Sequence, residues 1–258
     1  MGKILLWKEN APDMDVCGAQ LPPSMLPFEV EGSHGAVLVC PGGAYMGKAP
    51  HEGNPVCEML NSYGISAFCL DYRVTPCRHD TPLKDAKRAL RMIRSMGYEK
   101  VGILGFSAGG NLCCSAATLY DEGDPESTDP IERFTSRPDV FVPCYAVVSM
   151  VSYGHLGSTM NLLGEAYENM DLRKRYSAEL NVTENTPPAF IWHTADDDLV
   201  EIRNALLLAS ALSGKKVEFE LHVYPHGHHG LGLATDDPVV SAWGKDCSRF
   251  LCDHGFGK

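Results

Sequence analysis

The stretch "KVGILGFSAGGNLCCSAATLY" (residues 100–120) changes from one structural pattern to another at a serine. Its first part, "KVGILGFS", is a short apolar run typical of a buried strand, and "AGGNLCCSAATLY" predicts the helix after it. The two meet in "GFSAGG" (105–110), which fits the G-x-S-x-G pattern of a sharp strand-to-helix turn that exposes a serine hydroxyl. Side chains at Gly105 and Gly109 would collide with neighbouring backbone in such a turn, and this explains the two glycines.

The same alternation of strand and helix patterns extends through the chain. Strands are predicted at 35–43, 65–73, 100–107, 139–150, 189–195 and 216–224, and helices at 53–64, 81–97, 108–120, 203–214 and 237–255. This order predicts an α/β fold, with a mostly parallel central sheet and helices on both faces. We interpret residues 1–258 as one domain, with a surface loop at 121–138 and a short cap-like insertion at 152–188 that contains a helix near 161–167.

Composition excludes several classes of protein. Of the 258 residues, 44% are hydrophobic and 21% charged, which indicates a sizeable core. The formal net charge of −11 argues against a nucleic-acid partner, because phosphate binding needs a basic surface. No run of apolar residues is long enough to span a membrane, so no membrane association is expected. The start, "MGKILLWKEN", has only four consecutive apolar residues, too few for a secretion signal, and a cytoplasmic location is expected.

Polar and sulfur-containing residues outside the serine motif receive structural interpretations. The ten cysteines include no C-x-x-C pair and several lie in apolar runs, so we expect them to be reduced and mostly buried. Asp85 and Arg88 lie three residues apart in a predicted helix and are expected to form a surface pair. Asp71 and Arg73, in "LDYR", are expected to form a structural polar pair.

A serine nucleophile needs a base, and the base needs a carboxylate to orient it. On this type of fold the acid follows the serine in the chain and the histidine comes last. The segment "FIWHTADDDLV" (190–200) places Asp196, Asp197 and Asp198 after a late predicted strand. The segment "LHVYPHGHHGLGLA" (221–234) then supplies histidines after the next strand. The order and spacing of these three segments therefore predict a serine hydrolase.

The negative charge that develops on the substrate oxygen needs backbone donors. One donor is the N–H of Ala108, directly after the serine, and others are expected from "CPGGAY" (40–45), which follows a predicted strand. Tyr45 in this loop either lines a pocket for the acyl group of the substrate or packs in the interior. The sequence favours neither role.

The four histidines in residues 222–229 raise the alternative of a metal site. Their run "HGHHG" lacks the aspartate of the H-x-H-x-D-H motif of metallo-β-lactamase-fold hydrolases, and almost no further metal-binding side chains follow it. Zinc needs about three protein ligands in a defined geometry. We therefore expect no metal and no cofactor, and one histidine that carries a proton.

Six motifs in order give the chain a family resemblance. They are "VLVCPGGAY", "LDYR", "LKDAKRALRMIR", "GFSAGGNL", "PPAFIWHTADDDLV" and "YPHGHHGLGLA". The sequence resembles α/β-hydrolase-fold esterases from about residue 4 to residue 252, and is most similar to the acetyl esterase and carbohydrate esterase group, which includes acetyl xylan esterase-like and prolyl-oligopeptidase-like hydrolases. The resemblance implies a serine esterase that uses neither metal nor cofactor.

The resemblance also assigns roles to individual positions. It implies that Ser107 is the nucleophile, that His229, which precedes a glycine, is the base, and that backbone donors lie at Gly43, Ala44 and Ala108. The family's acid lies four residues before a position that is often proline and is Glu201 here. This implies Asp197 as the acid, with Asp196 as the alternative.

The expected substrate is a small-molecule ester, in particular an acylated carbohydrate. A polar, charged insertion at 152–188 suits a short acyl group and a hydroxyl-rich alcohol, so we expect deacetylation of acetylated sugars or xylo-oligosaccharides. The alternatives are a feruloyl esterase, a prolyl-oligopeptidase-like peptidase, although no propeller domain precedes this domain in the sequence, and a non-catalytic binding protein. The sequence does not determine the oligomeric state.

Overall fold

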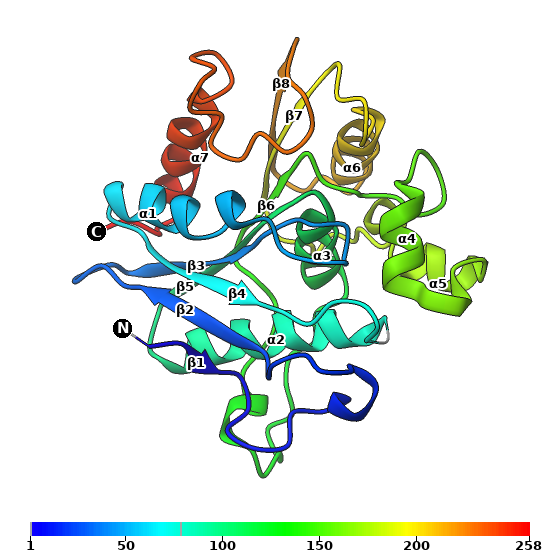
Figure 1. Cartoon of the computed structure of the whole chain (residues 1–258). Helices are drawn as coiled ribbons and strands as arrows, with labels where there is room; N and C mark the ends of the chain where they lie inside the picture. The colour runs from blue at the N-terminus through cyan, green and yellow to red at the C-terminus, as the bar shows by residue number, and fades with distance from the viewer. Residues whose placement is uncertain (1, 78) are drawn as a thin grey trace.

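The computed structural model describes residues 2–77 and 79–258. In these residues eight strands form one sheet in the order β1-β2-β4-β3-β5-β6-β7-β8 (Figure 1). The strands β1 and β2 pair antiparallel at one edge, and the other strands are parallel. Their bounds are β1 Ile4–Leu5, β2 Ser24–Phe28, β3 Gly35–Cys40, β4 Ser66–Asp71, β5 Lys100–Phe106, β6 Phe141–Cys144, β7 Ala189–Thr194 and β8 Phe219–Tyr224. The predicted mostly parallel sheet is confirmed.

Helices cover both faces of this sheet (Figure 1). The apolar side chains of α1 and α7 pack with one set of strand residues, and those of α2, α3 and α6 pack with the other set. The helices are α1 Asn54–Ser62, α2 Asp80–Ser95, α3 Ser107–Thr118, α4 Leu156–Leu163, α5 Met170–Arg175, α6 Arg203–Gly214 and α7 Ala242–Asp253. This is the expected α/β architecture, in which each parallel strand is buried from both sides.

The strand β5 lies at the centre of the sheet, between β3 and β6. Its residues from Val101 to Phe106 are buried, because neighbouring strands and both helical layers surround them. At its carboxyl end Gly105 pairs with Cys40 of β3, and Phe106 pairs with Cys144 of β6. The loops that leave these three strands therefore start side by side at one edge of the sheet.

Three predicted elements differ most from their bounds in the structure. The strand expected at 139–150 ends at Cys144, because Tyr145 has a φ of 33° and the chain then turns so that the Val147 amide donates to the Ser107 carbonyl. The helix expected near 161–167 occupies Leu156–Leu163, and it begins where the His155 ring accepts a hydrogen bond from the Ser158 amide. The last helix begins at Ala242 and not at residue 237.

The expectation that every cysteine is reduced is wrong for two of them. Cys17 and Cys77 form a disulfide, although 60 positions separate them in the chain. The N-terminal segment folds back over the connection between β4 and α2, where the Gln20 side chain binds both the amide and the carbonyl of Val74. This long-range packing, which no local pattern in the sequence indicates, brings the two thiols together. The other described cysteines are free, and most are buried as expected.

Both expected ion pairs are also wrong. Asp85 is completely buried and binds the guanidinium of Arg73, with 2.6 Å between Oδ1 and Nη2 and a further bond from the Arg73 amide. Asp71 binds instead the ammonium groups of Lys3 and Lys48. In a regular strand residues two apart share a face, but β4 ends at Asp71, and Arg73 lies beyond the strand with a different set of partners.

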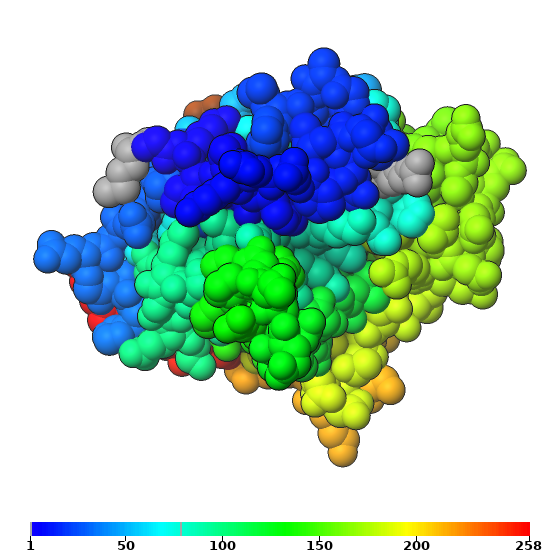
Figure 2. Space-filling model, turned by 90° about the horizontal axis from the view of Figure 1, so that it is seen from below, coloured from blue at the N-terminus to red at the C-terminus, as the bar shows by residue number. Residues whose placement is uncertain are grey.

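Arg88 binds the N-terminal segment and the loop at 121–138, and not Asp85. It donates to the Leu6 carbonyl and pairs with Asp129 and Glu132. Figure 2 shows the result from below: the N-terminal segment and the loop at 121–138 lie side by side over α2. These two segments cover the face of α2 on which a surface pair of Asp85 and Arg88 was expected.

We expect Asp85→Ala to lower the free energy of unfolding by about 3–5 kcal/mol, because it leaves the buried Arg73 guanidinium without its carboxylate. Urea denaturation measures this change. Asp253→Ala is the matched control, since Asp253 binds Arg249 at the surface of α7 and such exposed pairs contribute about 0–1 kcal/mol. Equal losses in the two variants would contradict the assigned role of the buried pair.

Candidate active site

Ser107 lies at the junction of β5 and α3 in a strained backbone conformation. Its φ is 53°, in the left-handed region, and its side chain is 9% exposed. A Cβ at Gly105 would collide with the Gly109 carbonyl, and a Cβ at Gly109 would collide with the Cys40 and Pro41 carbonyls. The turn is therefore possible only with glycine at both positions, as the motif predicted. Because Ser107 is also the first residue of α3, the helix dipole favours negative charge beside it.

The structure brings Ser107, His229 and Asp197 into one chain of hydrogen bonds. The distance from Ser107 Oγ to His229 Nε2 is 2.8 Å, and the distance from His229 Nδ1 to Asp197 Oδ2 is 2.7 Å. Nδ1–H donates to the carboxylate, which leaves Nε2 free to accept the serine proton. This tautomer is the one that activates a serine hydroxyl.

Asp197 is held as an ionised carboxylate by several donors. Its Oδ1 accepts from the amides of Leu199 at 3.0 Å and Val200 at 2.9 Å. Its Oδ2 lies 3.3 Å from Nε2 of the buried His193. Burial alone raises the pKa of Asp197, but the bonds from His193, His229 and Val200 outweigh it and hold that pKa well below its usual range.

The neighbouring aspartate and histidines have other partners. Asp196 accepts from Nδ1 of His226 at 2.9 Å and from the Gly227 amide, and the His226 side chain is 84% exposed. His228 is exposed, and His222 binds Glu220 on β8. Within the residues that the structure describes, no three His, Cys, Asp or Glu side chains are placed to hold a metal ion. The geometry pairs Asp197, and not Asp196, with His229.

The loop after β3 supplies backbone donors next to Ser107. Gly43 and Ala44 have positive φ values of 133° and 54°, so the backbone here is neither strand nor right-handed helix. Across residues 2–77 and 79–258, the amides of Gly43, Ala44 and Ala108 have no hydrogen-bond partner. A Cβ at Gly42 would lie 3.0 Å from the Ser107 Cβ, so this loop, residues 41–45, packs directly on the serine. We call it the oxyanion loop, after the role that we propose for it below.

Tyr45, for which two roles were open, packs in the interior. It is 1% exposed, and its hydroxyl donates to Oδ1 of the buried Asn111 at 2.8 Å. Its ring meets the Tyr72 ring edge-on. Tyr45 therefore anchors the oxyanion loop to the protein interior through Asn111 and Tyr72.

The insertion at 152–188 lies beside the same loop. Asn161 of α4 donates to the Ala44 carbonyl at 2.8 Å. At the start of α4, His155 lies close enough to His229 that the two imidazoles repel each other's charge; burial first and this repulsion second lower the pKa of His155. The exposed apolar side chains Leu156 and Met160 stand on α4, and Met46 follows the oxyanion loop. The insertion therefore lies beside both the oxyanion loop and His229.

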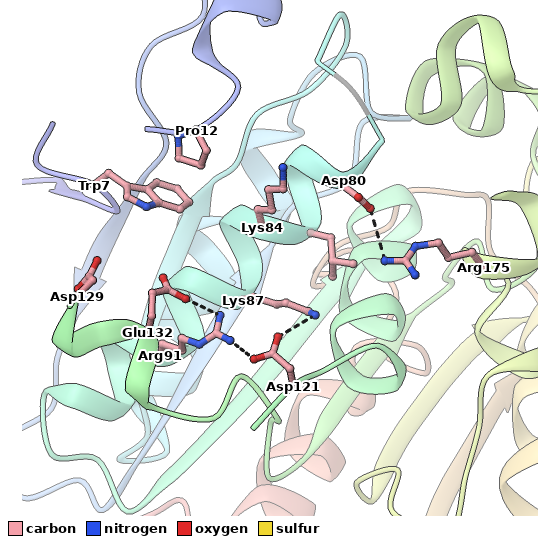
Figure 3. Close-up of a pocket in the computed structure, with 11 residues that line it drawn as sticks. Trp7, Pro12, Asp80, Lys84, Lys87, Arg91, Asp121, Asp129, Glu132 and Arg175 are labelled. Atoms are coloured by element: carbon pink, nitrogen blue, oxygen red, sulfur yellow. Dashed lines mark hydrogen bonds and ion pairs between the residues drawn. The ribbon is translucent and has the colours of Figure 1, made fainter. Parts of the chain in front are cut away.

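A separate cavity of about 530 Å³ lies on the other side of the molecule, along α2 (Figure 3). It contains Trp7 and Leu83 but none of the three residues of the hydrogen-bond chain. Its charged side chains bind one another: Arg91 pairs with Asp121 and Glu132, and Arg175 pairs with Asp80 (Figure 3). Because these groups neutralise one another, we assign this cavity no ligand.

Two buried residues next to the site, Glu52 and Tyr145, were not predicted from the sequence. Glu52 follows the oxyanion loop in "GKAPHEG", where a glutamate before a helix is read as an ordinary first-turn acid. Tyr145 lies within a segment that was predicted as strand. Only their long-range contacts distinguish them from other polar residues.

The structure contains no helix, among its described residues, that is long and apolar enough to cross a membrane.

The sheet order and the serine at the β5–α3 junction are those of α/β hydrolases, and solved structures of that class share the fold. Residues 25–212 match the BD-FAE family, and the chain belongs to this family.

Three relatives illustrate the similarity. An acetyl ester-xyloside bifunctional hydrolase from Caldicellulosiruptor lactoaceticus is 41% identical, with a TM-score of 0.92 over 100% of this chain and 97% of that one. An endo-1,4-beta-xylanase B of Butyrivibrio fibrisolvens is 36% identical over 80% of this chain and 34% of its own length. An acetylxylan esterase of Xylanibacter ruminicola is 34% identical over 90% of this chain and 47% of its own length. The chain thus spans a third to a half of these two curated relatives.

The lowered pKa of Asp197 predicts a stability that depends on pH. The carboxylate contributes stability above the unfolded-state pKa of about 3.9, and this contribution is lost as the pH falls toward the lower folded-state pKa. The difference in unfolding free energy between the wild type and Asp197→Asn should therefore be constant above about pH 5 and should shrink as the pH falls from about 5 to 2. Denaturant titrations across this range measure it. A difference between the wild type and Asp197→Asn that stays constant as the pH falls would contradict the assignment.

Proposed function

We propose that this protein is a serine esterase in which Ser107 is the nucleophile, His229 the general base and Asp197 the residue that orients the base. The observation that carries the proposal is the continuous chain of hydrogen bonds from Ser107 Oγ through His229 to Asp197, with distances of 2.8 and 2.7 Å. A serine, a histidine and a carboxylate in this arrangement form the minimum set for acyl transfer at neutral pH.

The reaction proceeds in two halves. Ser107 Oγ attacks the ester carbonyl carbon while His229 Nε2 takes the hydroxyl proton. The proton then passes to the oxygen of the departing alcohol, and the acyl group stays on Ser107. In the second half His229 Nε2 takes a proton from water, whose oxygen attacks the acyl carbon. The bond from that carbon to Ser107 Oγ then breaks, the imidazolium returns the proton to Oγ, and the carboxylic acid leaves. Proton transfers balance in each half, so the cycle requires neither metal nor cofactor.

The amides of Gly43, Ala44 and Ala108 stabilise the oxyanion that forms in both halves. They are without partners in the described residues and border Ser107, which begins α3. Donors fixed in advance by the backbone stabilise a developing charge without reorganisation, and loss of one such donor typically slows turnover about 100–1000-fold. The conformation of the oxyanion loop therefore matters as much as the serine itself.

We assign the substrate as the acetyl ester of a sugar or xylo-oligosaccharide. The acetylxylan esterase and the acetyl ester-xyloside hydrolase among the relatives support this assignment. The insertion also supports it, because its outer part, around η4 (Gly164–Ala166) and α5, exposes charged side chains that suit a hydroxyl-rich alcohol. These are Glu165, Glu168, Asp171, Lys174 and Arg175.

Substitution of the hydrogen-bonded residues tests the mechanism. Ser107→Ala and His229→Ala should each lower kcat for p-nitrophenyl acetate by several orders of magnitude without unfolding the protein. Ser107→Ala should also abolish labelling by a fluorophosphonate probe. His226→Ala is the matched control, since this exposed histidine lies in the same loop and binds Asp196, and it should keep most activity. Excess EDTA should change nothing; loss of turnover that zinc restores would overturn the proposal.

A series of p-nitrophenyl esters tests the acyl specificity. Activity should peak at acetate or butyrate and fall sharply by octanoate, because each further methylene that a small acyl pocket must hold is worth roughly 1 kcal/mol of discrimination. Release of acetate from acetylated xylo-oligosaccharides tests the alcohol side. A maximum at octanoate or a longer chain would defeat the substrate assignment but not the mechanism. A strong preference for feruloyl esters would also defeat it and identify a feruloyl esterase.

A further inference from the structure

A buried carboxylate connects the two loops on which the proposed chemistry depends. Glu52 ends the short 3₁₀ helix η2 (Pro50–Glu52), and it is 2% exposed. Its Oε2 accepts the Gly42 amide of the oxyanion loop at 2.7 Å. Its Oε1 accepts the hydroxyl of Tyr145 at 2.6 Å. One carboxylate thus binds a residue that follows β3 and a residue that follows β6.

Tyr145 continues this connection to the loop that carries His229. Its hydroxyl oxygen accepts the Gly232 amide at 2.9 Å while its hydrogen is given to Glu52. Its ring also meets the His229 ring, with 5.0 Å between centroids and an interplanar angle of 70°. Burial and the adjacent Glu52 raise the pKa of Tyr145 well above its usual value, so the phenol keeps its proton and remains a donor. The tyrosine therefore holds both the histidine ring and the backbone three residues after it.

The residue before Glu52 contacts the same histidine loop. Nε2 of His51 donates to the Gly230 carbonyl at 2.8 Å. On the other side of η2, the Ala49 amide donates to the Gly42 carbonyl at 2.9 Å. The segment 49–52 therefore binds both the amide and the carbonyl of Gly42 in the oxyanion loop. It also binds the histidine loop, residues 226–232, directly at Gly230 and through Tyr145 at Gly232.

An apolar side chain could not take the place of Glu52. Burial of a carboxylate costs several kcal/mol unless its oxygens find donors, and here each oxygen has one. Removal of the carboxylate would leave the Gly42 amide and the Tyr145 hydroxyl without an acceptor in a dry interior, where each unsatisfied group costs about 1–3 kcal/mol. The two donors lie in the loops that follow β3 and β6, so the carboxylate fixes the distance between these two loops.

We propose that Glu52 is a positioning residue, which through Gly42 and Tyr145 holds the oxyanion loop and His229 in register with Ser107. The proposal rests on the function proposed above for Ser107 and His229. Glu52 touches neither the substrate nor the reacting atoms, and it acts on turnover through the geometry of the groups that do. A displacement of about 1 Å at a reacting group can cost about 100-fold in rate, so small movements of either loop are enough.

Two variants test the proposal with little change in volume. Glu52→Gln keeps the shape but presents one oxygen and one NH₂ group, so only one of the two donors retains an acceptor. Tyr145→Phe keeps the ring against His229 and removes the hydroxyl link to Gly232. Each variant should lower kcat for p-nitrophenyl acetate about 10–100-fold, the usual size of an effect exerted through a neighbouring residue, with KM within about twofold. The double variant should lose little more than the worse single variant, because both remove the same connection.

Tyr176→Phe is the matched control. Tyr176 is as buried as Tyr145, and its hydroxyl also donates to a carboxylate, that of Asp80. Among the described residues, its side chain has no hydrogen bond or ring contact with the loop that carries His229. This variant should lose stability yet keep kcat within about twofold of the wild type, a split that a purely structural role of Tyr145 would not produce. Assays are run well below the lowest melting temperature of the set, and if one of the two test variants does not fold, the other decides.

The outcomes separate this proposal from the proposed function. Ser107→Ala in the same assay reports on the nucleophile alone: if it retains activity, the function assigned to the site fails, and the positioning role fails with it. If Ser107→Ala is inactive, the test variants decide. A fall in kcat of less than about fivefold in either of them, an effect on KM in place of kcat, or an equal fall in Tyr176→Phe would each overturn the positioning role of Glu52.

Discussion

The backbone of Ser107 is held at a φ of 53° where β5 ends and α3 begins, and the surrounding structure is arranged to permit this turn. Three glycines allow it, because a Cβ at Gly42, Gly105 or Gly109 would collide with the backbone or side chains that pack around the serine. The lack of a side chain at Gly109 lets the helix α3 approach the backbone of Cys40 and Pro41 closely. This one close approach of backbones places a hydroxyl, a helix N-terminus and unpaired amides within the same small volume.

Parallel topology converts this local constraint into a site. The strands β3, β5, β7 and β8 all end at one edge of the sheet, so the loops after them converge although the serine and histidine are 122 positions apart in the chain. Convergence alone does not give the register that proton transfer needs. The polar contacts beneath the loops, with Glu52 and Tyr145 at their centre, supply fixed distances between elements that the sheet only brings near each other.

The surface around α2 is stabilised in a different way. There the N-terminal segment and the loop at 121–138 cover α2, and the guanidinium groups of Arg73 and Arg88 lie over the indole of Trp7. Charged groups in this region are matched with one another, in the buried pair of Arg73 and Asp85 and around the cavity of Figure 3. Charged groups around α2 are therefore paired, whereas the amides of Gly43, Ala44 and Ala108 beside the serine have no partner among the described residues.

The sequence by itself did not determine the antiparallel strands β1 and β2, but it did determine the alternation of strands β3 to β8 with helices, the serine turn and the three segments that form the hydrogen-bond chain. These are encoded locally: apolar periodicity sets the elements, glycines set the turn, and chain order fixes which loops leave the same edge of a parallel sheet. Tertiary structure alone decided the disulfide of Cys17 with Cys77, the partners of Arg73 and Asp71, the interior position of Tyr45 and the connection through Glu52. Each of these joins side chains far apart in sequence, and which of them meet depends on how the segments pack over the sheet, a property that no window of sequence contains.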